Sequence, residues 1–444
     1  MPKLIELTTT PKSGYYHIDA LLNSSPDWNY YQPTVANTLF YTFVVHSDSE
    51  ISDVSNLTAF TPTQQAAANL AIAELAKYTG INFVQTTDTN LANIALVNGN
   101  ILKDNTMGLA AWSYGYDELP NGEFTNYIAG GTLYMDSVEF GQQNANLSPG
   151  TRGYETLLHE LGHLMGLKHP FDAKPDNTTT LPAGQDGAFY TVMSYSTFSA
   201  PGQTYAQYDI AALRWLYGGD GLGGARGASE GSGKYLVGTP FVDNLLGSAL
   251  SDMFEGGYGN DNIDGGAGTD FVKIDVARHL MTLTKTATGW SLDDGVSVDQ
   301  LVNVERVLYD GGAIALDVNG TAGQAYRVYN AAFDRAPDAA GVGFWIAQMD
   351  KGVPLHDIAH GFMQSNEFVT MYGANPTNEA FVAKLYQNVL DRAGEQAGVD
   401  FWVAALNEGR TDHASVLAHF SESAENVANI ATVIGNSFPY IPYG

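Results

Sequence analysis

The chain contains the stretch His159-Glu160-Leu161-Gly162-His163-Leu164-Met165-Gly166-Leu167-Lys168-His169. On a helix, the side chains of His159 and His163 lie one turn apart on the same face. Two imidazoles in that arrangement can hold one side of a tetrahedral Zn²⁺. Glu160 is rotated by about 100° around the helix, so it cannot be a third ligand on that face. Its carboxylate can still reach a metal-bound water, where a general base belongs.

The third metal ligand has to come from chain that has left the helix. Gly166 accepts the left-handed conformation that ends helices, which lets His169 return toward the metal. A His-Glu-x-x-His pattern alone also occurs by chance on ordinary amphipathic helices. Because the glycine and the third histidine follow at fixed offsets, we predict a zinc site made by His159, His163 and His169, with Glu160 as general base.

A second pair of histidines offers an internal control. His356 and His360 are also four residues apart in a predicted helix, but Asp357, with its shorter side chain, takes the place of the glutamate. No third histidine follows at a suitable spacing. We therefore interpret this pair as part of a solvated helix face.

The segment Thr191-Val192-Met193-Ser194-Tyr195 matches the Met-turn that follows the zinc helix in metzincins. The chain resembles the serralysin branch of these zinc endopeptidases over about residues 14–275. The other segments that carry this resemblance are His169-Pro170, Gly14-Tyr15-Tyr16-His17-Ile18-Asp19-Ala20-Leu21-Leu22, Tyr208-Asp209-Ile210-Ala211-Ala212-Leu213 and Leu216-Tyr217-Gly218.

The resemblance implies roles for further residues. Met193 would form an apolar floor beneath the zinc ligands. Tyr195 would ligate zinc in the resting enzyme, swing away when substrate binds, and donate a hydrogen bond to the developing oxyanion. A sheet edge above the cleft would pair with the extended substrate backbone. The resemblance assigns this edge to Gly131, Thr132, Leu133 and Tyr134.

Composition limits the possible partners. The formal net charge is −28, from 20 basic and 48 acidic residues, which argues against nucleic acid or an anionic membrane as a partner. The chain has no cysteine, so it has neither disulfides nor thiolate metal sites. It shows no N-terminal secretory signal and no apolar run of about 18 residues, so we expect no membrane span. Taken alone, these absences would indicate the cytoplasm.

Residues 256–273 form two consecutive nonapeptides of the pattern G-G-x-G-x-D-x-U-x, and a weaker copy precedes them at 247–255. In this pattern the glycines allow a tight turn whose carbonyls face Ca²⁺, and each aspartate adds a carboxylate oxygen. A flexible Gly/Asp-rich linker is the alternative. The predicted calcium-binding residues are Gly256, Gly257, Gly259, Asp261, Gly265, Gly266, Gly268, Asp270 and, in the weaker copy, Asp252.

These nonapeptides resemble the RTX β-roll. Proteins with that module leave Gram-negative bacteria through type I secretion machinery with an uncleaved C-terminal signal, so the resemblance implies an extracellular protein. The missing N-terminal signal agrees with this route. Crowded aspartates repel one another without calcium, so we expect the roll to fold only where calcium is plentiful, outside the cell.

The predicted fold class is multidomain α+β. It combines a metzincin catalytic domain, with a five-stranded-type sheet and a zinc helix, a short RTX parallel β-roll and an all-α C-terminal module. The expected boundaries are 1–13 for a short N-terminal extension, 14–220 for the catalytic domain, 221–240 for a Gly-rich linker, 241–318 for the β-roll and its following strands, and 319–444 for the helical module.

Local patterns place the main elements. A helix is expected from Pro62 to Gly80 with Thr61 as N-cap, and the zinc helix over about 152–165. Strands are expected at 39–45, 94–97 and 132–135. The segment Gly218–Gly233 is dense in glycine, and we expect it to form a hinge between the catalytic and calcium modules. It contains a match to the dinucleotide fingerprint at Gly219-x-Gly221-x-x-Gly224, which we discard because no strand precedes it and no helical pattern follows.

The last part of the chain repeats internally. The pattern Tyr329-x4-Asp334-Arg335-x5-Gly341-x2-Phe344-Trp345 returns as Tyr386-x4-Asp391-Arg392-x5-Gly398-x2-Phe401-Trp402, and Ser365-x-Glu367 returns as Ser423-x-Glu425. We expect two stacked helical units, which resemble the helical modules of unknown function found behind RTX segments. A structural cap and a surface- or glycan-binding module are both open, and the Asp-Arg pairs are expected to support turns.

The leading interpretation is a secreted, calcium-stabilised zinc metalloendopeptidase, monomeric, acting on polypeptide substrates. A calcium-dependent surface or adhesion protein with a vestigial protease domain is the alternative. A latent zymogen is a third, although few residues precede the segment that resembles a mature serralysin start. Subsite preference, natural substrate and the number of calcium ions do not follow from the sequence.

Overall fold

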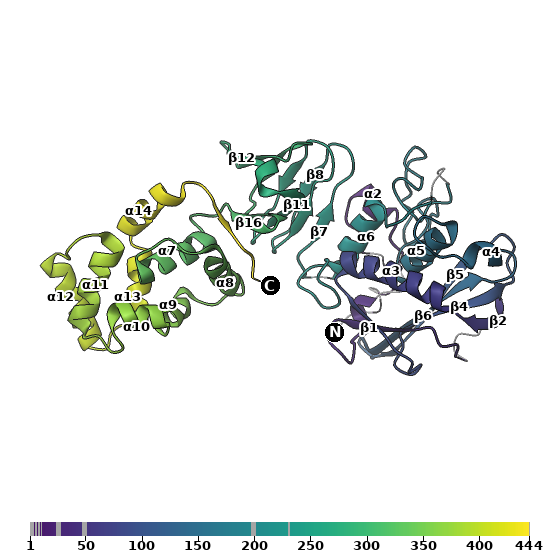
Figure 1. The fold of residues 1–444 in the computed structure, drawn as a ribbon, viewed down its shortest axis with the longest axis horizontal. Coiled ribbons are helices and arrows are strands. Elements are labelled where there is room, and N and C mark those ends of the chain that lie inside the picture. The colour runs from purple at the N-terminus through teal and green to yellow at the C-terminus, as the bar shows by residue number, and fades with distance from the viewer. Residues whose placement is uncertain are drawn as a thin grey trace. The chain divides into compact units, whose positions relative to one another are not determined.

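The computed structural model describes residues 4, 7, 9, 11–23, 28–46, 51–196, 201–229 and 231–443. The chain divides into two compact units, residues 1–259 and 260–444, and each unit is described by itself. Figure 1 labels their helices and strands. The structure is mixed α/β with a C-terminal helical region, as the sequence predicts, but the part after residue 319 is not all-α, because a strand at Phe438–Tyr440 follows its last helix.

The first unit is built on a mixed sheet. Five strands follow the order β3-β1-β4-β6-β5, and β2 pairs with β4 in addition. β5 and β2 run antiparallel to their neighbours, whereas the remaining pairs are parallel. The bounds are β1 Thr38–Thr42, β2 Val54–Ala59, β3 Asn82–Gln85, β4 Ile94–Ile101, β5 Gly108–Glu118 and β6 Phe124–Asp136. The sheet therefore has six strands, where the sequence analysis expects five.

The predicted position of residues 131–134 at the sheet edge is wrong. These residues lie in β6, where their backbone pairs with Ile94–Val97 of β4 on one side and with Leu109–Trp112 of β5 on the other. A strand paired on both sides has no backbone groups left for a substrate. On this side the sheet ends with β5, and on the other side it ends with β3.

The first unit also contains helices, and α3, α4 and α5 contact this sheet. The bounds are α2 Tyr16–Asp19, the 3-10 helix η1 Trp28–Tyr30, α3 Pro62–Thr79, α4 Gly141–Asn144, α5 Arg152–Leu164 and α6 Gln207–Tyr217. α5 packs directly on β5 and β6, because Cβ atoms built on Gly108 and Gly131 would press on its Thr156 and Leu164. Leu157, Leu158 and Leu161 bury the rest of that helix face.

Local capping explains where α3 and α5 begin and end. Thr61 accepts a hydrogen bond from the backbone N–H of Gln64, and Gly80 ends α3 in the left-handed conformation at φ +74°. The predicted helix at 62–80 is confirmed. α5 begins after Thr151, whose hydroxyl accepts from the N–H of Tyr154, and Gly166 beyond its end has φ +92°.

The glycine-rich segment after α6 packs on the first unit. The side chain of Asn37 accepts a hydrogen bond from the N–H of Leu222 and donates to the carbonyl of Gly80. Side chains at Gly219 or Gly221 would collide with Tyr235 or Asn37. The glycines expected to form a hinge therefore allow close approach of backbone to neighbouring residues.

Short strands follow at nine-residue spacing, with bounds β7 Tyr235–Val237, β8 Asn244–Leu246 and β9 Met253–Glu255. β7 pairs in parallel with β9. Within the second unit, β10 Asn262–Asp264 pairs in parallel with β14 Val298–Val302, and β11 Phe271–Ala277 with β15 Arg306–Asp310. At the second position of β8, β9, β10 and β11, the residues Leu245, Phe254, Ile263 and Val272 are almost fully buried.

Antiparallel strands extend both pairs of the second unit. β13 Trp290–Asp293 joins β14, and β12 Thr282–Lys285 joins β13 after the 3-10 helix η3 Arg278–Leu280. β16 Gly312–Ala315 joins β15, and β17 Phe438–Tyr440 returns from the far side of the helical region to join β16. Residues 313–315 thereby pair with chain that follows all the helices.

The helical region consists of two sets of four helices. Their bounds are α7 Thr321–Phe333, α8 Ala339–Asp350, α9 Leu355–Met363 and α10 Asn366–Tyr372, then α11 Asn378–Leu390, α12 Gln396–Asn407, α13 His413–Ser421 and α14 Ala424–Ile434. One apolar core, including Phe362 and Phe368 from the first set and Phe381 and Phe420 from the second, joins the two sets. The two copies of the repeat therefore stack on each other, as predicted.

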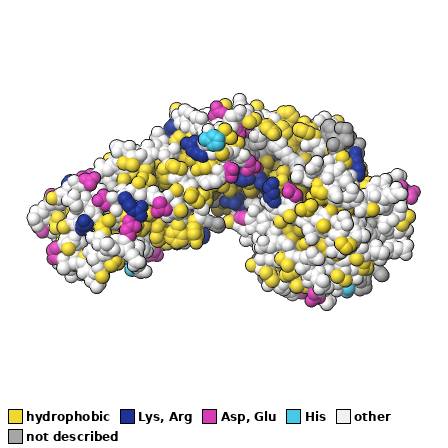
Figure 2. Space-filling model, in the orientation of Figure 1, with side chains coloured by type: hydrophobic (Ala, Val, Ile, Leu, Met, Phe, Trp, Pro, Cys, Tyr) yellow, Lys and Arg dark blue, Asp and Glu magenta, His cyan; other side chains and the backbone are white. Residues whose placement is uncertain are grey.

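No helix among the described residues is long and apolar enough to cross a bilayer. On the face drawn in Figure 2, Lys and Arg side chains of the described residues occur in small separate groups. This distribution agrees with the acidic composition and gives no extended basic surface on that face.

Candidate metal and catalytic site

The three predicted zinc-binding histidines lie together at the end of α5. His159 and His163 are one turn apart, and the reversal at Gly166 brings His169 back toward them. The Nε2 atom of His169 lies 3.2 Å from Nε2 of His159 and 3.1 Å from Nε2 of His163. Nitrogens bound tetrahedrally to one Zn²⁺ stand about 3.3 Å apart, so the donor set fits that ion.

Backbone carbonyls fix the proton on two of these rings. Nδ1 of His159 lies 2.8 Å from the carbonyl oxygen of Val192, and Nδ1 of His163 lies 2.8 Å from that of Leu167. Because a carbonyl can only accept, each Nδ1 carries the ring proton and each Nε2 presents its lone pair. Burial lowers the pKa of all three histidines, that of His169 to about 4. Neutral rings are the form that binds a metal.

Glu160 lies beside the start of β5. Its carboxylate accepts a hydrogen bond from the backbone N–H of Ala110, and a Cβ on Gly108 would stand 2.8 Å from its Cγ. The missing side chain at position 108 therefore makes room for this glutamate. Glu160 is 6% exposed, and burial raises its pKa to about 8. A carboxyl group that exchanges a proton near neutral pH suits a general base.

Met193 lies under the helix that carries the histidines. It is fully buried, and a Cβ built on Gly162 would stand 2.7 Å from its Sδ atom. The glycine between the two helical histidines thus lets the methionine reach the helix. The structure places Met193 where the sequence predicts an apolar floor.

Tyr195 lies among the histidine rings. Its ring centroid is 4.6 Å from that of His169 and 5.8 Å from that of His159. Phe171, which sequence reasoning missed, stacks on His169 at 5.2 Å with an interplanar angle of 6°. Burial raises the pKa of Tyr195, with Glu160 and Asp172 adding to the shift, so its phenol keeps its proton.

Asp209 is a second residue that sequence reasoning missed. It lies in α6 and is fully buried, and its carboxylate accepts hydrogen bonds from the Thr191 hydroxyl and the N–H groups of Val192 and Ala206. Burial raises its pKa to about 7, while these hydrogen bonds lower it. An acidic residue at the third position of a helix is an ordinary capping signal. The sequence around Asp209 therefore does not predict its contact with residues 191–193.

Glycines of the two consensus nonapeptides adopt positive φ angles. Gly257 and Gly259 have φ of 91° and 110°, and Gly266 and Gly268 have 91° and 129°. Only glycine adopts such conformations freely, so each turn can direct its carbonyls to one side. The aspartates Asp261 and Asp270 are fully buried.

Asp252, in the weaker copy, has protein partners. Its carboxylate accepts hydrogen bonds from the N–H and hydroxyl of Ser248 and from the N–H of Lys234. A further copy at 238–246, not recognised from the sequence, has the same arrangement: Thr239 donates its N–H and hydroxyl to Asp243. In both turns a hydroxyl residue stands where the consensus has its second glycine.

In the second unit, two acidic residues that follow the nonapeptides accept backbone hydrogen bonds, as Asp252 does in the first unit. Asp299 accepts the N–H of Asp261, and Glu305 accepts the N–H of Asp270. Burial raises the pKa of both carboxyl groups, that of Asp299 to about 6. The shared signal is an acidic residue two positions before a buried apolar one, and it lacks the glycines that make the consensus recognisable.

The control pair, His356 and His360, is not part of a cluster of potential metal ligands among the described residues. His356 contacts Asp357 and Asp412, and Nε2 of His360 lies 2.8 Å from the amide of Gln364. The carboxylates raise the pKa of His356. These side chains belong to exposed surface, as the sequence predicts.

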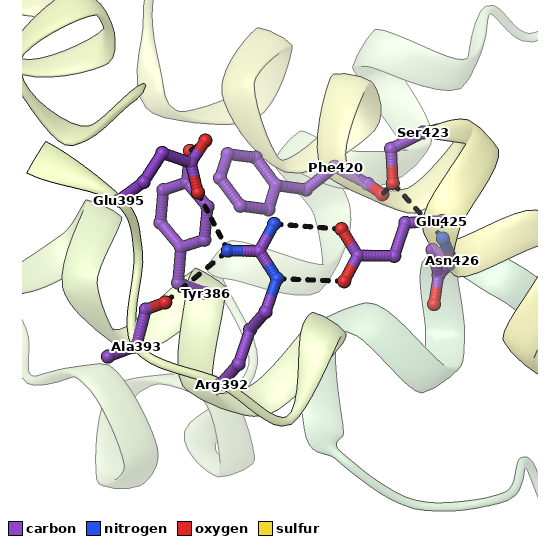
Figure 3. Close-up of polar contacts among 8 residues, drawn as sticks. All are labelled: Tyr386, Arg392, Ala393, Glu395, Phe420, Ser423, Glu425 and Asn426. Atoms are coloured by element: carbon purple, nitrogen blue, oxygen red, sulfur yellow. Dashed lines mark hydrogen bonds and ion pairs between the residues drawn. The ribbon is translucent and has the colours of Figure 1, made fainter. Parts of the chain in front are cut away.

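The repeated motifs of the helical region contact each other. Arg392 forms two hydrogen bonds with Glu425 and one with Glu395, and its guanidinium lies 5.3 Å from the ring centroid of Tyr386 (Figure 3). In the first copy, Arg335 binds Glu367 in the same bidentate way and lies 5.0 Å above the ring of Tyr329. The preceding residues, Asp334 and Asp391, end α7 and α11 in the left-handed conformation, each with φ 51°. The Asp-Arg pairs therefore support turns.

Comparison with known proteins gives two kinds of match. Residues 324–371 and 359–430 match a family described as a domain of unknown function, DUF4214. Serralysin of Photorhabdus luminescens is 31% identical over 195 residues, which cover 40% of this chain and 38% of that protein. Metalloprotease AprA of Pseudomonas entomophila is 29% identical over 218 residues, 45% of this chain and 42% of that protein. Serralysin G of Dickeya chrysanthemi is 26% identical over 192 residues, 40% and 39% of the two chains.

The chain is related to serralysin-type proteases. The relationship has moderate identity, and the chain spans about two fifths of the length of these curated relatives. It supports a peptidase, whereas the helical region corresponds to an additional module.

Proposed function

We propose that the first unit is a zinc endopeptidase of the serralysin type that hydrolyses peptide bonds in extracellular proteins. The strongest support is that three histidine Nε2 atoms converge. Nε2 of His169 lies 3.2 Å from Nε2 of His159 and 3.1 Å from Nε2 of His163. Glu160 on the same helix supplies the base. The relatives named serralysin and metalloprotease support the same class of enzyme.

In this proposal His159, His163 and His169 hold Zn²⁺, with Tyr195 as a further ligand at rest. When bound, the ion lowers the pKa of a water molecule toward neutrality and so makes it a nucleophile. Glu160 takes a proton from the attacking water and delivers it to the leaving amine. The phenol of Tyr195 donates a hydrogen bond to the carbonyl oxygen of the substrate as negative charge develops there.

β5 is the proposed substrate-binding strand, in place of residues 131–134. Its side away from β6 is an edge of the sheet, and Glu160 lies against its first residues, Gly108 to Ala110. An extended peptide added to this edge would form main-chain hydrogen bonds with β5 and pass close to the carboxylate. Main-chain recognition of this kind accepts many sequences.

The calcium proposal rests on the two consensus nonapeptides. Carbonyls of their glycines and the carboxylates of Asp261 and Asp270 would hold Ca²⁺. Asp252 is left out, because its carboxylate already accepts hydrogen bonds from Ser248 and Lys234. Calcium-dependent folding outside the cell agrees with type I secretion and with a monomeric extracellular enzyme.

The test is casein hydrolysis by the full chain in excess calcium, with and without a zinc-selective chelator. We expect both the chelator and Glu160→Gln to abolish most of the activity, the variant by roughly 10²-fold or more, while the variant keeps its zinc. A folded, zinc-loaded wild type without activity would contradict the proposal. It would favour a calcium-dependent surface protein with a vestigial protease domain.

Zinc content separates the ligands from other histidines. His163→Ala removes one of the converging nitrogens, so we expect the purified variant to lose its zinc. His360→Ala is the matched control, because this histidine belongs to the second i,i+4 pair and contacts Gln364. Equal zinc loss in both variants would refute the assignment of the site.

A further inference from the structure

A chain of hydrogen bonds leads from a zinc-binding histidine to a buried carboxylate. Nδ1 of His159 donates to the carbonyl oxygen of Val192 at 2.8 Å. The N–H of the same peptide group, that of Met193, donates to Oγ1 of Thr191 at 3.0 Å. The Thr191 hydroxyl in turn lies 2.5 Å from Oδ1 of Asp209. All five residues are buried, Thr191 and Asp209 completely.

Each link in this chain has one possible direction. A peptide carbonyl accepts and a peptide N–H donates, so the peptide group between Val192 and Met193 passes polarisation from one end to the other. Thr191 accepts from Met193, and its single proton therefore points to Asp209. Hydrogen bonds in series polarise one another, and the effect is larger in a buried site than in water.

We propose that Asp209 is a positioning residue for the proposed zinc site, acting on His159 through Thr191 and the Val192–Met193 peptide group. Metal-bound histidines commonly donate their second ring N–H to a carboxylate, which fixes the tautomer and increases the basicity of the nitrogen on the metal. Here the carboxylate is one peptide group and one hydroxyl away. This inference rests on the proposed function and assigns a further residue to the same site.

A purely structural role for Asp209 has to be separated from this one. Its second oxygen accepts the N–H groups of Val192 and Ala206, which ties the segment 191–193 to the start of α6. Replacing Asp209 would break both arrangements together. The Thr191 hydroxyl takes part in this chain of hydrogen bonds, which we call the relay, but not in the contacts of the second Asp209 oxygen. Substituting Thr191 therefore separates the two roles.

The experiment compares Thr191→Val, which removes the hydroxyl but keeps the shape, with Thr191→Ser, which keeps the hydroxyl. Both are made in the full chain with excess calcium. Zinc affinity is measured by chelator competition, the His159 Nδ1–H resonance by NMR of the zinc-loaded protein, and folding by thermal unfolding of the zinc-free protein. We expect Thr191→Val to weaken zinc binding about tenfold and to shift the resonance, and Thr191→Ser to stay within about twofold of the wild type.

Three results would overturn the proposal. The first is a Thr191→Val variant with wild-type zinc affinity and resonance. The second is an equal loss of affinity in both variants that follows a loss of stability in the zinc-free protein. The third is a wild type that binds no zinc, which would overturn the proposed function as well. A wild type that binds zinc tightly without hydrolysing casein would refute only the proposed function, because the relay is measured by zinc binding.

Discussion

Met193 occupies the space that a side chain on Gly162 of α5 would need. A Cβ added to Gly162 would stand 2.7 Å from Sδ of Met193, closer than such atoms approach in folded proteins. The glycine lies one residue before His163. Its lack of a side chain therefore sets how closely the buried methionine approaches the helix that carries the histidines.

Gly162→Ala should therefore disturb the proposed zinc site. Alanine favours the helix by about 1 kcal/mol, but the overpacked Met193 should cost about 1–3 kcal/mol. We expect a net loss of stability in the zinc-free protein and weaker zinc binding, measured by thermal unfolding and chelator competition. Gly141→Ala in α4 is the control, since a Cβ there meets no atom within 4 Å. An unchanged zinc affinity in Gly162→Ala would argue against this close contact.

The zinc-free protein should show a pH-dependent cost of burying Glu160. Burial raises the pKa of this carboxyl to about 8, from an ordinary value of 4.5. Between these two values the folded state keeps a proton that the unfolded state releases, so stability falls as the pH rises through this window. Glu160→Gln removes this cost, and we expect its unfolding midpoint to exceed that of the wild type by at least about 2 °C at pH 8.

At pH 4 the same substitution should have little effect, because Glu160 is protonated in both states there. Thermal unfolding at the two pH values, with a zinc-selective chelator and excess calcium, measures the difference. An equal increase at both pH values would mean that the glutamine acts through packing and would contradict the raised pKa.

The two kinds of nonapeptide turn should differ in their need for calcium. Ser248→Ala removes the hydroxyl that donates a 3.0 Å hydrogen bond to Asp252. We therefore expect the free energy of unfolding to fall by about 1 kcal/mol at any calcium concentration. Asp270→Asn removes a proposed calcium ligand, so its loss should be largest in high calcium, where the wild type gains most. The unfolding midpoint measured over a calcium titration distinguishes them. A Ser248→Ala effect that grows with calcium would restore Asp252 to the ligand set.

The repeated arginines of the helical region should contribute to stability equally. Arg392→Ala and Arg335→Ala each remove a bidentate pair with a glutamate and a contact with a tyrosine ring. Both pairs are about 40% exposed, so we expect only a small loss of stability in each variant, and a smaller loss in high salt. Chemical unfolding with and without added salt measures it. A large, salt-independent loss in one copy alone would point to a role beyond supporting the turn.

How far the sequence predicts the structure depends on how local the deciding contacts are. The limits of α3 follow from Thr61 and Gly80, because caps and left-handed glycines act within a few residues. The meeting of His159, His163 and His169 follows from one helix and the turn after it. The internal repeat likewise identified the Arg392 motif from the sequence alone, before the contact between Arg392 and Glu425 was known.

Pairing between distant segments could not be predicted in the same way. Alternation predicts a strand at 132–135, and the resemblance assigned residues 131–134 to a sheet edge, but which strands flank them depends on the order of the whole sheet. Asp209 reaches the site through Thr191, which is distant in sequence, and its place in α6 suggests only a helix cap. Asp299 and Glu305 lack the glycines that made the nonapeptides recognisable.

The return of β17 to β16 makes the helical region an insertion between two neighbouring strands. Residues 316–437 leave the sheet after β16 and re-enter it at β17, where Phe438 and Tyr440 are buried and the N–H of Ile441 donates to the carbonyl of Ala339. A shortened protein that stops after β16 would expose the ladder of that strand as an open edge, which favours association with other chains. Any shortened form made to study the catalytic unit should therefore keep residues 438–440, joined to residue 316 by a designed loop.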